Sequence, residues 1–414
     1  MDKPDLFIVG AGSVGLLLAL RYAKEFRQID IVESRRHIGG IARDFYDASG
    51  LVFFRGCQYL SREYLPDDTL EKLNLYSFEH RYSSITEQGR QWNFSRDFSG
   101  PAFRIDSLDI SVKQTKVTNV QEALDQYPSN IRNHLESFIS RVTKHDLSKL
   151  HSSSLTSLSM DRITSTTDED KLLKLKQSDG LIDALYGVRR EILGLSYEMG
   201  YLPKLGYDSF FQSMSEYLKE QAKVNFHISL NFRPEDIAET DLIPNLQYKL
   251  WCADPRPVVK YCTGYNLQSL SYSVHIYGLL ILQHSNLELP YYINVFSASN
   301  PILRLFFYSS DSEVKISVES VSPFGSQLEL IEAVQKLLIH TSLEIKFGAE
   351  IFAYRKTRRY FPITISDYIN IESSMKALGA QYWRDTYPYL YGRKERLSLI
   401  TSDLDHDLPI PDPN

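Results

Sequence analysis

The chain has 414 residues, 43% hydrophobic and 24% charged, so it has enough apolar material for a large core and for two interlocked domains. Its 46 Lys and Arg against 52 Asp and Glu give a formal charge of -6 without long runs of one sign, which argues against nucleic acid as an obligatory partner. Cys57, Cys252 and Cys262 match neither a zinc motif nor a disulfide framework. We therefore expect no metal site and a reducing, cytoplasmic setting.

The sequence predicts no membrane span. The N-terminus leads straight into an apolar strand, without the basic start and cleavage site of a secretory signal. The most apolar later run, residues 274–282, is too short to cross a bilayer and contains His275 and Gly278.

The first fifty residues have the pattern of a βαβ unit. Residues 6–9 are a short apolar run typical of a buried strand, 13–26 have helical spacing without proline, and 29–33 are again strand-like. Two such strands are expected to be parallel and joined by a right-handed crossover.

Later segments follow a different pattern. Residues 51–105 are aromatic and turn-rich, which favours an antiparallel insertion, and a Ser- and Thr-rich surface segment at 151–170 separates two helical stretches, 119–150 and 171–192. Further helices are predicted at 210–221 and 328–340, and strands at 224–232, 248–252, 274–282, 291–296, 302–309 and 313–318. Short strands and a last helix complete the chain.

Gly10, Gly12 and Gly15 form a G-x-G-x-x-G motif directly between a predicted strand and a predicted helix. The first glycine permits a tight turn, the second lets backbone N–H groups approach a pyrophosphate, and the third allows close packing of helix on strand. The phosphate charge would then lie at the positive end of the helix dipole, beside Ser13. The motif therefore predicts a dinucleotide site.

Glu33 ends the second strand, where its carboxylate can accept hydrogen bonds from both hydroxyl groups of an adenosine ribose. This points to FAD or NAD rather than NADP. Arg35 and Arg36 could neutralise a 2′-phosphate, so NADP stays a minor alternative.

Gly39 and Gly40 follow soon after Glu33. A second close approach of backbone to cofactor suits a long ligand whose ribityl and pyrophosphate groups must both be held, and NAD enzymes have little need of it. We therefore predict FAD, with a plain Gly-Gly turn as the alternative interpretation.

The run from Ile8 through Glu33 to Gly40 resembles the N-terminus of a flavoprotein superfamily that contains amine oxidases, protoporphyrinogen oxidases, phytoene desaturases and UDP-galactopyranose mutases. Those proteins bind FAD with such a segment. The motif and the resemblance together imply cofactor contacts at Gly10, Gly12, Ser13, Gly15, Glu33, Ser34, Arg35, Gly39, Gly40 and Ala42.

The resemblance extends to later segments. Residues 201–207 and the helix and strand that follow are similar to the family's Pro-Gly-Gly segment, which implies that the backbone at Leu230 meets the adenine. Residues 391–406 look like the flavin-closing segment and imply contacts from Gly392, Arg393 and Asp405.

Two departures matter for the activity. Lys204 and Leu205 stand where the family often has a glycine pair, and the tail after Arg393 lacks the Tyr-rich run of authentic galactopyranose mutases. The second departure favours the protoporphyrinogen-oxidase-like flavoproteins.

The pattern and the resemblance together predict an α/β protein with a Rossmann-type FAD-binding domain, whose sheet is mainly parallel, and an interleaved α+β substrate domain with a mixed sheet. We expect the FAD-binding domain to be discontinuous. The expected boundaries are 1–50, 200–257 and 385–407 for the FAD-binding domain, 51–199 for an antiparallel and helical insertion, and 258–384 for the substrate domain.

The most basic stretch, residues 354–360, supplies the candidate substrate contacts Arg358, Arg359 and Tyr360, which could hold a carboxylate or diphosphate. A solvated strand edge is the plain alternative.

Cys57 lies where related flavoproteins pass a loop near the isoalloxazine ring, although a buried structural cysteine explains it better. His406 could act as an acid or base, but a surface residue near a frayed end is the simpler interpretation.

The leading hypothesis is an FAD-dependent oxidoreductase that takes hydride from a small organic substrate at flavin N5, with the catalytic side chains unassigned. The alternative is a redox-neutral sugar isomerase resembling UDP-galactopyranose mutase, with a nucleotide sugar as substrate. A third hypothesis is a flavin-binding protein without turnover.

Overall fold

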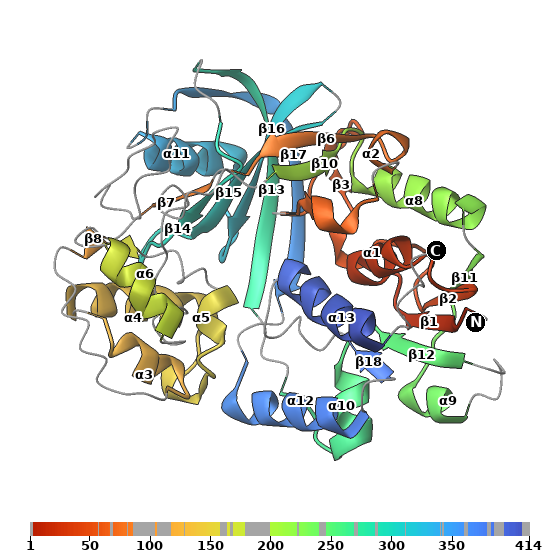
Figure 1. Ribbon diagram of the computed structural model, residues 1–414. Coiled ribbons are helices and arrows are strands. Elements are labelled where there is room, and N and C mark those ends of the chain that lie inside the picture. The colour runs from red at the N-terminus through yellow and green to blue at the C-terminus, as the bar shows by residue number, and fades with distance from the viewer. Residues whose placement is uncertain are drawn as a thin grey trace.

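Two large sheets organise the protein, a parallel sheet carrying α1 and a longer mixed sheet beside it, with helices α3 to α6 grouped at lower left (Figure 1). The computed structural model describes residues 3–56, 58–66, 69–80, 82–85, 104–105, 117–127, 129–157, 164–165, 169–178, 199–221, 223–239, 246–268, 272–285, 289–310, 312–339, 341, 343–359, 363–378, 382–384 and 393–407.

The predicted βαβ unit forms the centre of the parallel sheet. Strand β1 (Asp5–Val9), helix α1 (Ser13–Arg21) and strand β2 (Gln28–Glu33) follow one another as expected, although α1 ends at Arg21 rather than residue 26. The strand order is β11-β2-β1-β12-β18, and every neighbouring pair is parallel. The added strands are β11 (Val224–Ile228), β12 (Leu246–Trp251) and β18 (Tyr382–Arg384).

The second sheet has six strands in the order β17-β13-β16-β15-β14-β7. All pairs are antiparallel except β14 with β7, so this is the expected mixed sheet. Its strands are β7 (Tyr82–Ile85), β13 (Tyr272–His284), β14 (Tyr292–Val295), β15 (Ile302–Ser310), β16 (Glu313–Ser320) and β17 (Ile345–Arg359). The predicted α/β architecture with one parallel and one mixed sheet is confirmed.

The remaining elements surround the two sheets. The helices are α2 (Thr69–Lys72), α3 (Val120–Leu124), α4 (Ser129–Thr143), α5 (Ser154–Ser157), α6 (Glu169–Ser178), α8 (Tyr207–Gln221), α9 (Pro234–Glu239), α10 (Arg256–Thr263), α11 (Gln327–Leu338), α12 (Ile365–Leu378) and α13 (Arg393–Asp407). The short strands are β3 (Phe45–Tyr46), β4 (Val52–Phe53), β5 (Leu60–Ser61), β6 (Leu75–Glu79), β8 (Arg104–Ile105), β9 (Thr164–Ser165) and β10 (Met199–Pro203). Helices α9, α10 and α12 were not predicted from the sequence.

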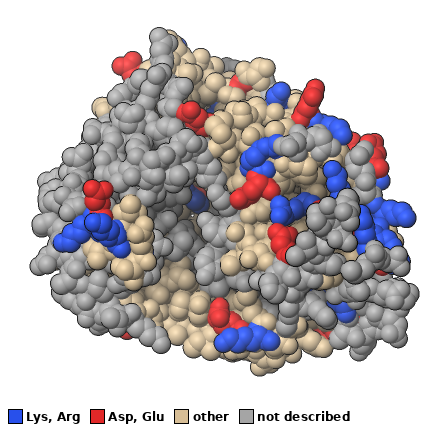
Figure 2. Space-filling view, in the orientation of Figure 1, with Lys and Arg blue, Asp and Glu red and all other residues tan. Residues whose placement is uncertain are grey.

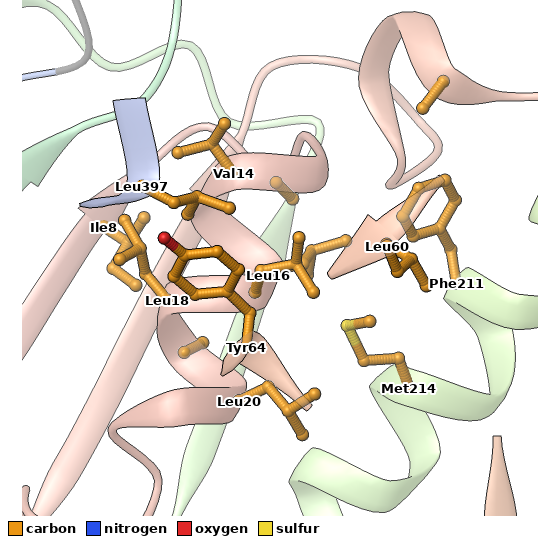
Figure 3. Close-up of a cluster of buried hydrophobic side chains, with 14 of the residues drawn as sticks. Ile8, Val14, Leu16, Leu18, Leu20, Leu60, Tyr64, Phe211, Met214 and Leu397 are labelled. Atoms are coloured by element: carbon orange, nitrogen blue, oxygen red, sulfur yellow. The ribbon is translucent and has the colours of Figure 1, made fainter. Parts of the chain in front are cut away.

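Helix α1 is buried on almost every side, which explains its nearly continuous apolar sequence. Leu16 and Leu18 are fully buried, and Phe211 and Met214 of α8 pack in the same cluster (Figure 3). Leu397 of α13 also packs there, so the end of the described chain returns to the first helix.

The β3–β4 hairpin packs on the mixed sheet, with Phe53 at the contact. Phe53 is fully buried and belongs to a cluster with Ile276 and Ala353. Gly278 of β13 lets the ring approach the sheet closely, because a Cβ atom there would stand 2.3 Å from Phe53 Cδ1.

Charges of both signs are interspersed over the described part of the face in Figure 2. None of the helices within the described ranges has the length and apolar character needed to cross a bilayer.

We predict that Gly278→Ala lowers the free energy of unfolding by about 1–3 kcal/mol, because the added methyl group displaces a fully buried ring. Urea denaturation measures the change. Gly348→Ala is the matched control, since a Cβ atom on this residue of β17 would meet nothing nearer than 3.6 Å. Equal stability of the two variants would contradict the packing argument.

Candidate dinucleotide-binding site

The glycine motif lies in the turn between β1 and α1, and two of its glycines are required by packing. Gly10 has φ +105°, and a Cβ atom there would lie 2.8 Å from the backbone nitrogen of Ala253. A Cβ atom on Gly15 would lie 2.2 Å from the carbonyl oxygen of Gly10. These two positions are therefore closed by the protein itself.

Gly12 differs from its two neighbours in the motif. It is the N-cap of α1 with φ -76°, and the structure describes no atom within 4 Å of the place a Cβ atom would take. It offers no capping side chain, and the first turn that begins at Ser13 carries no acidic residue. The first turn of the helix is thus left without a capping side chain or an acidic residue, an arrangement that suits a phosphate.

Glu33 lies beside this turn with its carboxylate held by the backbone. Its Oε2 accepts a hydrogen bond from Ala11 N at 3.0 Å and its Oε1 from Arg35 N at 2.8 Å, with Ser34 Oγ at 3.4 Å. The residue is only 8% exposed. An ionised carboxylate offers roughly four acceptor positions, so capacity remains for ribose hydroxyl groups.

The diglycine loop packs directly on the glycine motif. Gly39 N donates to Ala11 O at 2.7 Å, and Gly39 and Gly12 form a parallel bridge. Gly39 and Gly40 have φ +96° and +59°, and a Cβ atom on Gly40 would lie 3.2 Å from Gly12 Cα. Ala42 is buried just behind them. The two glycine segments therefore form one continuous cradle.

Leu230 is brought to the same place by the end of β11. Its backbone nitrogen donates to Glu33 O at 3.0 Å, and the preceding Ser229 N donates to Arg35 O at 3.2 Å. Leu230 is 46% exposed. An exposed apolar side chain next to Glu33 is suited to covering an aromatic base.

Asp405 is not brought into this cradle. Its Oδ2 pairs with Arg21 Nη2 at 3.0 Å, and its Oδ1 accepts from Tyr22 Oη at 2.8 Å. Arg21 ends α1, about 12 Å along the helix from Ser13 at a rise of about 1.5 Å per residue. The structure thus places Asp405 at the end of α1 opposite to the glycine motif.

The other expected site residues are placed only in part. Arg393 begins α13, and Arg358 and Arg359 end β17 opposite Ser273 and Tyr272, with only the backbone of these three arginines described. Cys57, Tyr360 and Gly392 lie outside the described residues, as does the side chain of His406. Within the described ranges, no group of His, Cys, Asp and Glu side chains could hold a metal ion.

A polar cluster that the sequence did not reveal lies just after the diglycine loop. Asp44 Oδ2 accepts from Asp208 N at 2.9 Å, whereas Asp44 Oδ1 is buried without a partner among the described residues. Asp208 is held by Arg43 through two hydrogen bonds of 2.9 and 2.8 Å and by Tyr46 Oη at 2.8 Å. Burial raises the pKa of Asp44 to about 8, so this carboxyl group is neutral at pH 7.

The sequence held only one signal for this contact. Gly206 has φ +92°, and a Cβ atom there would lie 2.4 Å from Asp44 Oδ2. A glycine alone does not indicate its distant partner.

Comparison with known proteins supports the fold and the N-terminal domain type. Residues 8–68 match the family model of the NAD(P)-binding Rossmann-like domain, and no curated protein matches the sequence. A crystal structure of reduced UDP-galactopyranose mutase is similar over 98% of this chain and 95% of that one, with 13% identity and a TM-score of 0.63. A protein from Pyrococcus furiosus is similar over 97% of both chains, with 13% identity and a TM-score of 0.51.

Residues 8–68 therefore form a Rossmann-like domain, and the whole chain shares its fold with the reduced UDP-galactopyranose mutase. At 13% identity this likeness concerns the fold and leaves substrate and reaction open.

We predict that stability falls with rising pH because of Asp44. The folded protein holds this proton up to about pH 8, whereas an unfolded aspartate loses it near about pH 3.9, so the free energy of unfolding decreases between these values. Asp44→Asn stays neutral and should remove roughly 1 kcal/mol per pH unit of that decrease, measured by urea denaturation across the window. Asp125→Asn, which alters an exposed carboxylate, should keep the wild-type slope. An unchanged slope in Asp44→Asn would refute the assignment.

Proposed function

We propose that this protein is an FAD-dependent oxidoreductase acting on a small organic substrate. The observation that carries the proposal is the single cradle built from two glycine segments, in which Gly39 N bonds Ala11 O at 2.7 Å while the space before Gly12 stays open. A cradle extended by a second segment suits a cofactor longer than NAD. The bound flavin would supply hydride acceptance at N5.

Different residues of the cradle would bind different parts of this cofactor. The backbone at Gly12 and Ser13 would bind the pyrophosphate, Glu33 the ribose and Leu230 the adenine, and Gly39 and Gly40 would let the remainder of the cofactor pass close to the backbone. The assignment of Gly392, Arg393, Arg358, Arg359 and Tyr360 stays a prediction from the resemblance and from charge.

The proposed domain division follows the two sheets. The FAD-binding part takes strands from 5–33 and 224–251, and β18 at 382–384 joins it just before the expected boundary at residue 385. We place the substrate between this sheet and the mixed sheet.

Absorption spectroscopy of the purified protein, followed by anaerobic titration with candidate substrates, tests the proposal. A flavin spectrum that bleaches with an organic substrate is the expected result. Protein that is colourless and remains so after FAD is added would remove the proposal, and bound flavin that no substrate reduces would favour the hypothesis without turnover.

We predict that Gly12→Ala separates folding from cofactor binding. A backbone at φ -76° with open space around Cβ accepts alanine, so the free energy of unfolding should stay within about 1 kcal/mol of the wild type. The methyl group would occupy the path of the pyrophosphate and should weaken FAD binding at least tenfold in a fluorescence titration.

Gly10→Ala provides the contrast for that experiment. Its φ of +105° and the contact with Ala253 N should lower the free energy of unfolding of the protein itself. Full FAD affinity in Gly12→Ala would show that the cofactor does not approach this turn.

A redox-neutral isomerase acting on a nucleotide sugar is the second candidate, favoured by the likeness in fold to UDP-galactopyranose mutase over nearly the whole of both chains. It predicts that UDP-sugars bind the dithionite-reduced protein at least tenfold more tightly than the oxidised protein, as measured by calorimetry. Indifference of both redox states to nucleotide sugars would end this candidate.

A further inference from the structure

Two guanidinium groups from distant parts of the chain lie close to the cluster that follows the diglycine loop. Arg55 comes after β4, and Arg355 belongs to β17. Desolvation by burial, and next the charge of Arg355, lower the pKa of Arg55. The fold therefore holds two like charges near each other, and Arg43 adds to the same field.

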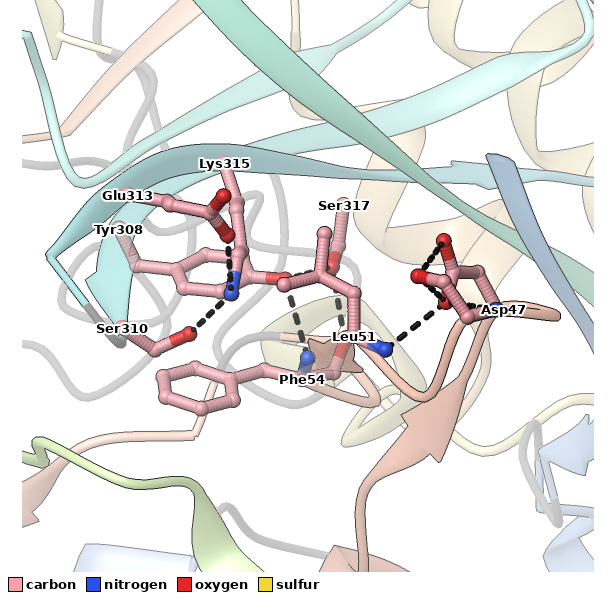
Figure 4. Close-up of polar contacts among 9 residues, drawn as sticks. Asp47, Leu51, Phe54, Tyr308, Ser310, Glu313, Lys315 and Ser317 are labelled. Atoms are coloured by element: carbon pink, nitrogen blue, oxygen red, sulfur yellow. Dashed lines mark hydrogen bonds and ion pairs between the residues drawn. The ribbon is translucent and has the colours of Figure 1, made fainter. Parts of the chain in front are cut away.

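Arg55 is fixed by the residue before it. Phe54 N donates to Tyr308 Oη at 3.0 Å, and Ser317 Oγ donates to Phe54 O at 2.7 Å, so both backbone groups of Phe54 are bound to the mixed sheet (Figure 4). The Phe54 ring also stacks on Tyr308, with centroids 4.2 Å apart. The backbone at Arg55 is thus anchored to the sheet.

Arg355 shares a sheet face with the residues that this segment covers. It pairs with Ile276, and Ala353 on the same face of β17 pairs with Gly278, against which Phe53 packs. The Arg355 side chain itself is exposed, so the face opens to solvent at this point. The Arg355 guanidinium group is therefore accessible on the sheet face against which Phe53 packs.

The carboxyl groups nearby do not balance these charges. Asp208 and Asp44 are the carboxyl groups that act on Arg55, but Asp208 is already bound by Arg43 through two hydrogen bonds. Asp44 is held protonated by burial. The Nε of Arg55 is buried without a hydrogen-bond partner among the described residues, which costs free energy until an acceptor arrives.

We propose that Arg55 and Arg355 bind an oxyanion of the substrate, a carboxylate or a phosphate, at the boundary between the cofactor cradle and the mixed sheet. Guanidinium groups bind both kinds of oxyanion in bidentate fashion, and the uncompensated charge supplies the attraction. Asp44 lies four residues after Gly40 in the chain. The proposed oxyanion site is therefore close to the segment that follows the diglycine loop. The inference rests on the proposed function in one respect, because it takes the bound oxyanion to be part of the substrate.

Calorimetry on the purified full-length protein tests the inference, with inorganic pyrophosphate and malonate as separate probes. We expect saturable binding of at least one probe, and a loss of affinity of at least tenfold in Arg55→Met and in Arg355→Met. Binding of pyrophosphate alone assigns a phosphate and binding of malonate alone a carboxylate, and both results support the site.

Lys346→Met is the matched control, because it removes an exposed cation from the same strand. Its partner on β13 lies seven residues from that of Arg355, which is about 23 Å at about 3.3 Å per residue. This variant should bind the probes as the wild type does. Arg355→Met changes an exposed residue and keeps the test valid should Arg55→Met fold poorly.

No saturable binding of either probe to the wild type, or unchanged affinity in a folded Arg355→Met, would overturn the inference. The absorption spectrum of the same sample reports the flavin independently. Loss of the proposed cofactor and loss of the oxyanion site are therefore separate results.

Discussion

The approach of two backbone segments, at Gly12 and at Gly39 and Gly40, is the contact on which the candidate site depends. The distance of 3.2 Å from Gly12 Cα to the place of a Gly40 Cβ leaves no room for a larger residue without a shift. The same contact determines what lies around it, because Phe211 of α8 fills the space that a side chain on Gly39 would need. Glycine here acts by permitting backbone contact, and the cradle is built from main-chain atoms.

A run of aromatic rings connects this cradle to the mixed sheet. Tyr207 begins α8, the helix that contacts Gly39, and its ring meets Phe54 at 5.1 Å edge to face. Phe54 in turn stacks on Tyr308 of β15. The glycine cradle and the mixed sheet are therefore held in one packed arrangement, and the position of Arg55 follows from it.

The parts of the fold that could be predicted from the sequence are those with local signals. The βαβ unit was predictable because residues 6–9 of β1 are a continuous apolar run and the glycine motif marks where α1 begins. Strand β17 was expected as short strands, because its charged residues from Arg355 to Arg359 do not have the apolar pattern of a strand. The structure has one strand of 15 residues there. Its length is set by pairing along β13, which the periodicity of β17 alone does not show.

The site was predictable to the same extent. Gly10, Gly12, Gly15 and Glu33 lie within one βαβ unit, so their proximity follows from chain connectivity. The resemblance implied a cofactor contact from Asp405, but the position of a helix depends on packing, and α13 returns along α1 to place Asp405 at the far end.

The charge state of the cluster around Arg55 depends on burial, which could not be predicted from the sequence. Asp44 and Asp208 are separated by 164 residues, and nothing in either segment indicates that folding brings them together. Once they are together, withdrawal from water keeps a proton on Asp44, and the bidentate contact with Arg43 occupies Asp208. Both effects remove negative charge from the surroundings of Arg55. The positive field at Arg55 and Arg355 is therefore a property of the folded cluster, in a chain whose formal charge is -6.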